Sequence, residues 1–132
     1  GNFERKICFL CLLVWLLHKN LTSSVAYYNS KMSKKILRKI IVTDLAPKPV
    51  APYNQAVVID NTIYLSGVVG VDPRTNKLVD GGTAAEAKQA LLNMKQILSV
   101  ANSKMGNVVK TTVLLADIGD FAGVNEVYKE RK

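Results

Sequence analysis

The stretch from Thr83 to about Ser103 constrains the fold most, because it carries the clearest helical pattern in the chain. Apolar side chains recur there at helical spacing along one face, and polar side chains occupy the other. The apolar face holds Ala87, Leu91, Met94, Leu98 and Ala101, flanked by Ala90 and Ile97, and the solvent side holds Lys88, Lys95 and Ser99. Thr83 and Glu86 have the spacing of a capping box. The sequence therefore predicts a long helix that must be covered on one side.

The segments before this helix are typical of strands. Residues 36–43 are rich in β-branched side chains and predict a first strand. Three prolines within residues 44–52 predict an extended connection. Residues 55–59 and 62–66 flank the turn signal Asp60-Asn61 and predict a β-hairpin. The glycine-containing stretch from 67 to 82 is expected to be a loop.

The segments after this helix predict one more strand and then a second helix. Residues 107–116 predict a strand that is apolar towards its end, as for a strand central in a sheet. Asp120 is placed to cap a second helix, with Phe121, Val124 and Tyr128 expected to face inward. The order of elements predicts an α+β fold in which two helices cover one face of a mixed sheet.

The positive charge of the chain is concentrated at its beginning. The formal net charge is +8, of which residues 1–43 contribute +7 and residues 44–132 only +1. A nucleic-acid-binding domain needs a basic surface to neutralise phosphates. The near-neutral second part argues against a nucleic acid as partner.

Residues 1–31 differ in character from the rest. Residues 7–17 are eleven consecutive apolar residues with basic neighbours, too short for a membrane span of about 20 residues. They suit either a secretory signal or an upstream extension before Met32, and the extension is the favoured interpretation. We therefore expect an N-terminal extension over 1–31 and a domain over 32–132, with membrane association only if residues 7–17 are retained. Cys8 and Cys11 are interpreted as part of the apolar run, because no second ligand pair accompanies them.

The chemistry open to the domain is limited by what the sequence lacks. From Met32 onward there is neither His nor Cys, since His18 and both cysteines precede it. This excludes Cys nucleophiles, Ser-His-Asp triads and nearly all zinc sites. The glycines at 67 and 70 form no phosphate-binding fingerprint. Asp72 and Asp80 are expected to be solvated loop charges.

Three groups remain as candidate site residues. Tyr53 follows Pro52 in a stiff segment that could present its phenol rigidly. Ser66 and Gly67 end a strand, where a hydroxyl and an approachable backbone often meet ligands. Asn125 is an amide on the second predicted helix. Each also has an ordinary interpretation as a turn aromatic, a strand-end serine or a surface amide.

The chain from about Ile40 to Lys129 resembles the RidA/YjgF family of reactive-intermediate (enamine/imine) deaminases, some of whose animal members are called translation inhibitors or ribonucleases. The matching motifs are Ala51-Pro52-Tyr53-Asn54-Gln55-Ala56, Tyr64-Leu65-Ser66-Gly67, Asp72-Pro73 followed by Gly81-Gly82, residues 87–98, Val109-Lys110-Thr111-Thr112-Val113, Asp117-Ile118-Gly119-Asp120-Phe121 and Val124-Asn125-Glu126-Val127-Tyr128. Several ordered motifs over about 90 residues make the resemblance specific.

The resemblance implies a chorismate-mutase-like α+β fold that assembles as a homotrimer, with sites between subunits. It also implies hydrolysis of 2-imino acids, such as 2-iminopropanoate and 2-iminobutanoate, to 2-oxo acids and ammonia, with no metal and no organic cofactor. Tyr53, Ser66, Gly67 and Asn125 would bind the substrate, and Tyr53 and Asn125 would act in catalysis, Asn125 by polarising the substrate or positioning water. The implied location is cytoplasmic, or mitochondrial, with secretion or membrane targeting as the alternative.

The family pattern continues past the second helix with a Phe-Pro-Ala-Arg-type segment and last strands that end in a glutamate-rich motif. Its arginine grips the substrate carboxylate, and this chain diverges from the pattern at Arg131. We therefore expect the last strands to be missing and the chain as it stands to have little activity, with Arg74 a poor substitute. The alternatives are an endoribonuclease or translation inhibitor, and a non-catalytic isoform that joins trimers of the full-length protein.

Overall fold

The structure is a computed structural model that describes residues 9–11 and 35–130. The elements in chain order are β1 (Phe9–Cys11), β2 (Arg38–Ile41), β3 (Ala56–Ile59), β4 (Thr62–Leu65), β5 (Val71–Asp72), β6 (Lys77–Leu78), α1 (Gly82–Val100), the 3-10 helix η1 (Met105–Asn107), β7 (Thr112–Leu114), the 3-10 helix η2 (Ile118–Asp120) and α2 (Phe121–Lys129). Apart from Phe9–Cys11, the predictions for residues 1–31 lie outside the described residues.

The strands β2, β3 and β4 form an antiparallel sheet in that order. The predicted hairpin is confirmed, because Ile59 pairs with Thr62 across Asp60-Asn61 and Asp60 adopts a φ of 50°. A residue with such a φ lies in the left-handed region that tight turns use and that Asp tolerates. The predicted first strand is also confirmed, within the shorter bounds of β2. Two further antiparallel pairs, β1–β7 and β5–β6, complete the described strands.

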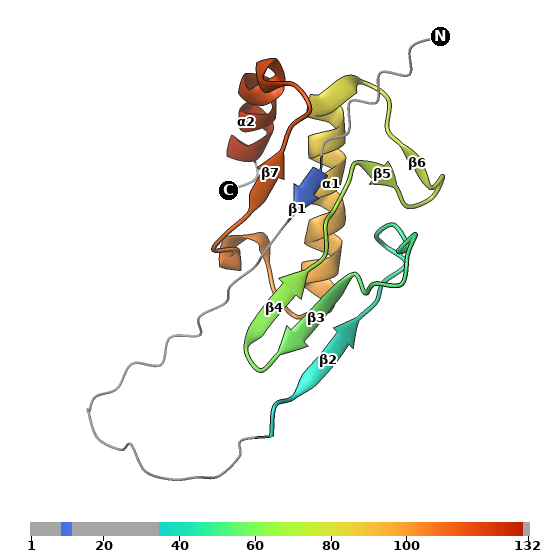
Figure 1. Cartoon of the computed structure of the whole chain (residues 1–132), viewed down its shortest axis with the longest axis vertical. Coiled ribbons are helices and arrows are strands. Elements are labelled where there is room, and N and C mark those ends of the chain that lie inside the picture. The colour runs from blue at the N-terminus through green and yellow to red at the C-terminus, as the bar shows by residue number, and fades with distance from the viewer. Residues whose placement is uncertain (1–8, 12–34, 131–132) are drawn as a thin grey trace, which may run out of the picture.

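The helix α1 covers one face of this sheet, and α2 packs beside α1 (Figure 1). Because side chains alternate across a strand, Ile41, Ala56 and Leu65 share the face that meets the helix. They form one buried cluster with the predicted apolar face of α1, from Leu91 to Leu98. Lys88, Lys95 and Ser99 are exposed, as predicted. The α+β class and the amphipathic helix are therefore confirmed.

The capping box predicted at Thr83 and Glu86 is wrong. Gly81, with a φ of 110°, stands at the N-cap, and no side-chain capping hydrogen bond is made there. The Oγ1 of Thr83 instead donates to Oδ2 of Asp120 at 2.6 Å, across the contact between α1 and α2. Asp120 precedes α2 as predicted, but its carboxylate accepts this bond and does not cap the helix. Both polar side chains therefore join the two helices.

Three other expectations need correction. The predicted loop over 67–82 contains the short hairpin β5–β6, because Asp72-Pro73 opens a tight turn there. The strand predicted over 107–116 is shorter, because only β7 is a strand and η1 precedes it. Thr112 and Leu114 of β7 are exposed. Val124 is buried and Tyr128 packs against the core, but Phe121 is 58% exposed and does not face inward. No helix among the described residues is long and apolar enough to cross a membrane.

Candidate functional site

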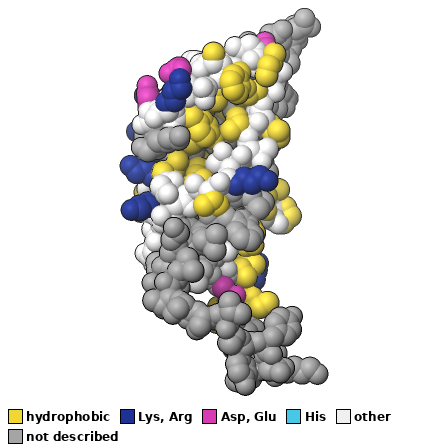
Figure 2. Space-filling model, turned by 90° about the vertical axis from the view of Figure 1, so that its left-hand side faces the viewer, with side chains coloured by type: hydrophobic (Ala, Val, Ile, Leu, Met, Phe, Trp, Pro, Cys, Tyr) yellow, Lys and Arg dark blue, Asp and Glu magenta, His cyan; other side chains and the backbone are white. Residues whose placement is uncertain are grey.

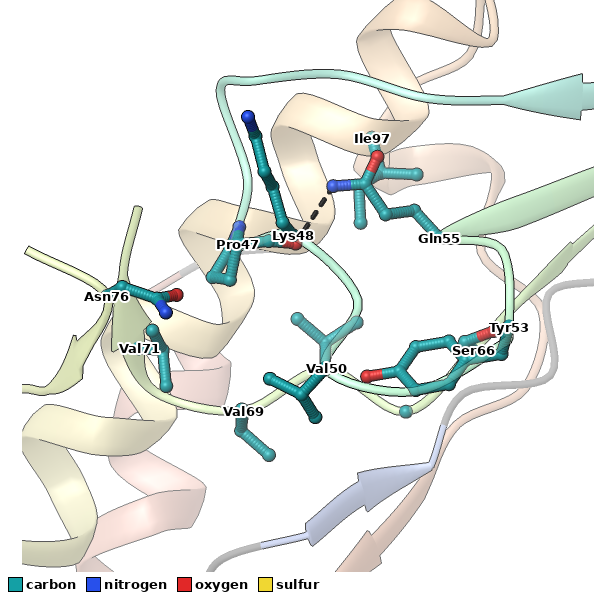
Figure 3. Close-up of a pocket in the computed structure, with 12 residues that line it drawn as sticks. Pro47, Lys48, Val50, Tyr53, Gln55, Ser66, Val69, Val71, Asn76 and Ile97 are labelled. Carbon is teal, nitrogen blue, oxygen red and sulfur yellow. Dashed lines mark hydrogen bonds between the residues drawn. The ribbon is translucent and has the colours of Figure 1, made fainter. Parts of the chain in front are cut away.

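A small cavity opens where the proline-containing segment 47–55 passes the end of β4. Its volume is about 120 Å³, and Tyr53, Ser66 and Gly67 line it together. Figure 3 shows that the segment from Pro47 to Gln55 borders it on one side and the stretch from Ser66 to Val71 on the other. The other lining residues are Pro47, Lys48, Val50, Gln55, Val68, Val69, Val71, Asn76 and Ile97. The structure thus gathers three of the four expected site residues around one mostly apolar hollow.

Gln55 fixes the segment that forms one wall of this cavity. Its side chain is buried, with 5% of its surface exposed. Its Oε1 accepts a hydrogen bond from the Thr43 N–H at 2.7 Å, and its Nε2 donates to the carbonyls of Thr43, Ala46 and Pro47 at 3.0, 3.3 and 2.9 Å. Buried polar groups require such partners. Gln55 therefore ties a stretch without regular structure to the start of β3.

Ser66 presents its hydroxyl oxygen as an acceptor. Its Oγ donates to the Asn54 carbonyl at 2.5 Å, and its N–H donates to the Gln55 carbonyl at 3.1 Å. A serine hydroxyl has one proton and two lone pairs. Because the proton is committed to Asn54, the lone pairs remain to receive an N–H or O–H from a ligand.

Tyr53 contributes its phenol beside Ser66, at the same end of the cavity (Figure 3). Its N–H donates to the Ala51 carbonyl at 2.7 Å, which closes a tight turn around Pro52. Its side chain is half-exposed and, in Figure 3, reaches along the segment toward Val50. The phenol can therefore donate to a ligand that enters the cavity, because a tyrosine hydroxyl both donates and accepts.

The two loop carboxylates do not form a catalytic pair. Asp72 accepts from Arg74, whose Nη2 and Nε lie 3.0 and 3.3 Å from its carboxylate. Side-chain hydrogen bonding to Arg74 lowers the pKa of Asp72 and, in return, raises the pKa of Arg74. Asp80 is exposed. Among the residues that the structure describes, no three His, Cys, Asp or Glu side chains come together as a metal site would require.

The sequence profile of a family described as Endoribonuclease L-PSP matches residues 43–131. That range includes both walls of the cavity. The chain belongs to this family, which is the RidA/YjgF family.

Several of its relatives are named 2-iminobutanoate/2-iminopropanoate deaminase, and others are named as RutC family proteins. The human 2-iminobutanoate/2-iminopropanoate deaminase is 57% identical over 95 residues, which cover 72% of this chain and 69% of the human protein. The crystal structure of RidA from an Antarctic Psychrobacter superposes with a TM-score of 0.69 at 42% identity, over 71% of this chain and 76% of that one. Escherichia coli TdcF with bound serine gives a TM-score of 0.67 at 37% identity, over 70% and 72% of the two chains. The RidA/YjgF fold is thereby confirmed.

In this RidA/YjgF chain the fourth expected site residue stands apart from the others. Asn125 is exposed on α2 and lines a different cavity of about 250 Å³. That cavity is otherwise lined by Thr111, Val113, Leu115, Phe121, Val124 and Tyr128. A single chain therefore does not bring Asn125 to Tyr53 and Ser66.

Sequence reasoning did not single out Gln55, Lys48 or Val50 as site residues. Gln55 stands in a family motif, but nothing in its spacing indicates that its amide turns inward to hold the preceding segment. Lys48 and Val50 lie in a stretch without periodicity, so only the folded path of the chain brings them to the cavity.

Proposed function

We propose that this chain binds small 2-imino acids in the cavity of Tyr53 and Ser66 and promotes their hydrolysis. Water adds to the protonated C=N carbon, and the tetrahedral adduct expels the nitrogen as ammonia and leaves the 2-oxo acid. One water is consumed and no electrons are exchanged, so the reaction needs no redox partner. The observation that carries the proposal is the cavity that Tyr53, Ser66 and Gly67 line together. It lies in a chain that is 57% identical to the human 2-iminobutanoate/2-iminopropanoate deaminase.

The size of the cavity supports a small substrate. At about 120 Å³ it is comparable to the engineered cavity of about 150 Å³ that binds benzene. A four-carbon imino acid has a similar number of heavy atoms, whereas a nucleotide is several times larger. The structure of TdcF with bound serine shows that a relative also takes a small amino acid.

The cavity residues suit this reaction. The lone pairs of Ser66 can accept an iminium N–H or orient the attacking water, and the phenol of Tyr53, which lies beside Ser66, can donate to the substrate. Holding a water and a polarised C=N in the correct geometry lowers the barrier without a strong nucleophile. Gly67 is exposed beside Ser66 and leaves room for the ligand.

We propose that the site is completed by a second copy of the chain in a homotrimer. Asn125 lines a separate cavity within one chain, so a neighbouring subunit is the source from which its amide could reach the substrate. Exposed apolar side chains on α2, on β7 and on the sheet β2–β4 support such packing, and Figure 2 shows hydrophobic side chains grouped over the half of the molecule that holds α2 and β7. A cytoplasmic or mitochondrial location is part of the proposal, because these compartments hold the pyridoxal-phosphate enzymes that release imines.

The test is ammonia release from 2-iminopropanoate generated enzymatically from serine, with and without the purified chain. We expect the chain to accelerate release and Ser66→Ala to lower the rate about 10- to 100-fold, because an oriented hydrogen-bonding group is lost. Ser99→Ala, on the exposed side of α1, is the matched control. A rate equal to that in buffer alone would exclude the deaminase.

Endoribonuclease activity is a second candidate, because the matching family carries that description. The same preparation is incubated with single-stranded RNA. The endoribonuclease would be favoured if the chain cleaves RNA, if Ser66→Ala abolishes this cleavage, and if the chain releases no ammonia. Binding to full-length relatives without either activity would favour a non-catalytic isoform.

A further inference from the structure

A groove of about 390 Å³ lies apart from the cavity of Tyr53 and is lined by both helices and by the stretch that leads into β7. Leu91 and Met94 come from α1 and Tyr128 from α2. The other lining residues are Met105, Gly106, Val108, Val109, Lys110 and Thr111. Most of these side chains are apolar, so water in the groove finds few hydrogen-bond partners. The groove therefore suits an apolar occupant.

The strand β1 lies beside β7 and shows which segment of the chain is directed at this groove (Figure 1). The two strands are antiparallel, with Phe9 opposite Leu114 at one end and Cys11 opposite Thr112 at the other. A chain that continues from β1 in this direction passes along the residues that precede β7. The first of them, Thr111, already lines the groove.

The residues that follow β1 in the sequence match the groove in length and in chemistry. Residues 12–17 are Leu-Leu-Val-Trp-Leu-Leu, six consecutive apolar residues. If the register of β1 and β7 continues, they come to lie opposite residues 106–111, and five of those six residues line the groove. The backbone of Val108, with φ −75° and ψ 122°, is already extended, as pairing with a strand requires.

The strand β7 also needs such a neighbour. Among the described strands it pairs with β1 alone. An edge strand presents unpaired N–H and C=O groups that can pair with another chain, and proteins commonly cover such edges. A segment that continues β1 would extend this cover along the residues before β7.

We propose that residues 12–17 dock in the groove as a continuation of β1, so that the apolar residues 7–17 add a strand to β7 within the same chain. Strand addition of this kind combines main-chain hydrogen bonds with pockets for side chains. The proposal is independent of the proposed reaction, because the groove and the cavity of Tyr53 share no lining residue. Residues 7–17 are then a structural part of the domain, and while docked they are not inserted in a membrane.

Disulfide formation in the full chain tests the register. One variant pairs Leu12→Cys with Thr111→Cys, and a second pairs Leu13→Cys with Lys110→Cys. Opposite residues of antiparallel strands have Cα atoms about 4.5–5.5 Å apart, which a disulfide can span. Two adjacent pairs are needed because hydrogen-bonded and non-hydrogen-bonded positions alternate along the ladder.

Both variants carry Cys8→Ala and Cys11→Ala, so that no native thiol competes. Leu13→Cys with Lys77→Cys, at an exposed position on β6, is the matched control. We expect mild oxidation to form an intrachain disulfide in at least one of the two pairs and to leave the control reduced, as mass spectrometry would show. No disulfide in either pair, or equal formation in the control, would overturn the proposal. Disulfide-linked dimers would also overturn it, because the groove would then hold the segment of a second copy.

Fluorescence of Trp15 reports on the same contact in the chain without engineered cysteines. It is the single tryptophan of the chain, and its partner in the continued register is Val108. We expect the native chain to emit at shorter wavelength than the chain unfolded in urea. Val109→Asp should shift the native emission toward that of the unfolded chain, because a carboxylate in the groove disfavours an apolar occupant.

Val109 is 57% exposed, so the domain should still fold in this variant, and circular dichroism checks that it does. Leu78→Asp, at a 50% exposed position on β6, is the matched control and should leave the emission unchanged. Equal emission maxima in the native and the unfolded wild type would overturn the proposal. A native maximum that Val109→Asp does not shift would overturn it as well.

Discussion

At the scale of single residues, a few side chains replace regular structure in shaping the site. Residues 42–55 contain no strand or helix, and the four hydrogen bonds of the Gln55 amide hold their path. The hydroxyl of Ser66 likewise ties the end of β4 to Asn54, just before β3, at the open end of the hairpin. These hydrogen bonds depend on the positions of individual side-chain atoms, and no pattern in the sequence predicts them.

Gln55→Leu should lower the free energy of unfolding by about 2–4 kcal/mol, because buried backbone groups of residues 43–47 lose their partners. Urea denaturation measures the effect, with Gln96→Leu on α1 as the control. We also expect the cavity to lose its shape, so the rate of ammonia release should fall together with the stability. If Gln55→Leu is as stable as the wild type, the prediction is wrong, and water replaces the Gln55 amide as the partner of these backbone groups.

The Asp72 carboxyl should titrate below its ordinary pKa of 3.8, because hydrogen bonds from Arg74 favour the charged form. A lowered folded-state pKa means that this contribution to stability is present above the ordinary value and is lost as the pH falls through the lowered one. The carboxyl carbon shift of Asp72, followed by NMR, measures it. In Arg74→Ala the titration should move back toward the ordinary value, and an unmoved titration would refute the pairing.

At the scale of elements, α1 organises the molecule through contacts on several sides. Its apolar face packs on β2–β4, and Asn93, buried to 1% exposure, donates to the carbonyls of Val69 and Val71. Thr83 joins it to the start of α2. The stretch from Ser66 to Val71, which forms one wall of the cavity, is therefore positioned by α1.

Gly70 lets this stretch approach the helix. A Cβ at Gly70 would lie 2.5 Å from Cα and 2.6 Å from the carbonyl oxygen of Glu86. Gly70→Ala should therefore reduce the free energy of unfolding by about 1–3 kcal/mol, as overpacking does. Gly106→Ala, where a Cβ meets nothing within 4 Å, is the control. Equal urea midpoints for the two variants would contradict the close approach.

At the scale of the whole molecule, the sheet β2–β4 is covered on one face by α1, and no described helix or strand packs on its other face. Ile40, Val57 and Tyr64 pair across the three strands and so share the open face. Ile40 and Tyr64 are exposed. An apolar row of this kind marks a surface that another chain can cover.

If the homotrimer packs on this row, the wild type should sediment at three times the 14.5 kDa of one chain. Ile40→Lys should shift it to the mass of a single chain, because a buried lysine at the interface would lose its hydration. Leu78→Lys, an exposed position on β6, is the control. Analytical ultracentrifugation gives the masses, and a wild type that sediments as a single chain would refute the trimer.

The sequence by itself determined the elements whose signal is local. The apolar face of α1 and the hairpin around Asp60-Asn61 follow from repeats of about 3.6 and 2 residues and from one turn dipeptide. The motifs that resemble the RidA/YjgF family likewise gave Tyr53, Ser66 and Gly67, which share a cavity in the structure.

Only the tertiary structure decided how side chains distant in the sequence meet. Thr83 and Asp120 had the local spacing of caps, yet they bond to each other because α1 and α2 lie side by side. Packing also placed Asn125 at a separate cavity, left Phe121 exposed, and brought Lys48 to the wall that Gln55 holds. These contacts depend on the folded path of the chain between the partners, and a local pattern carries no information about that path.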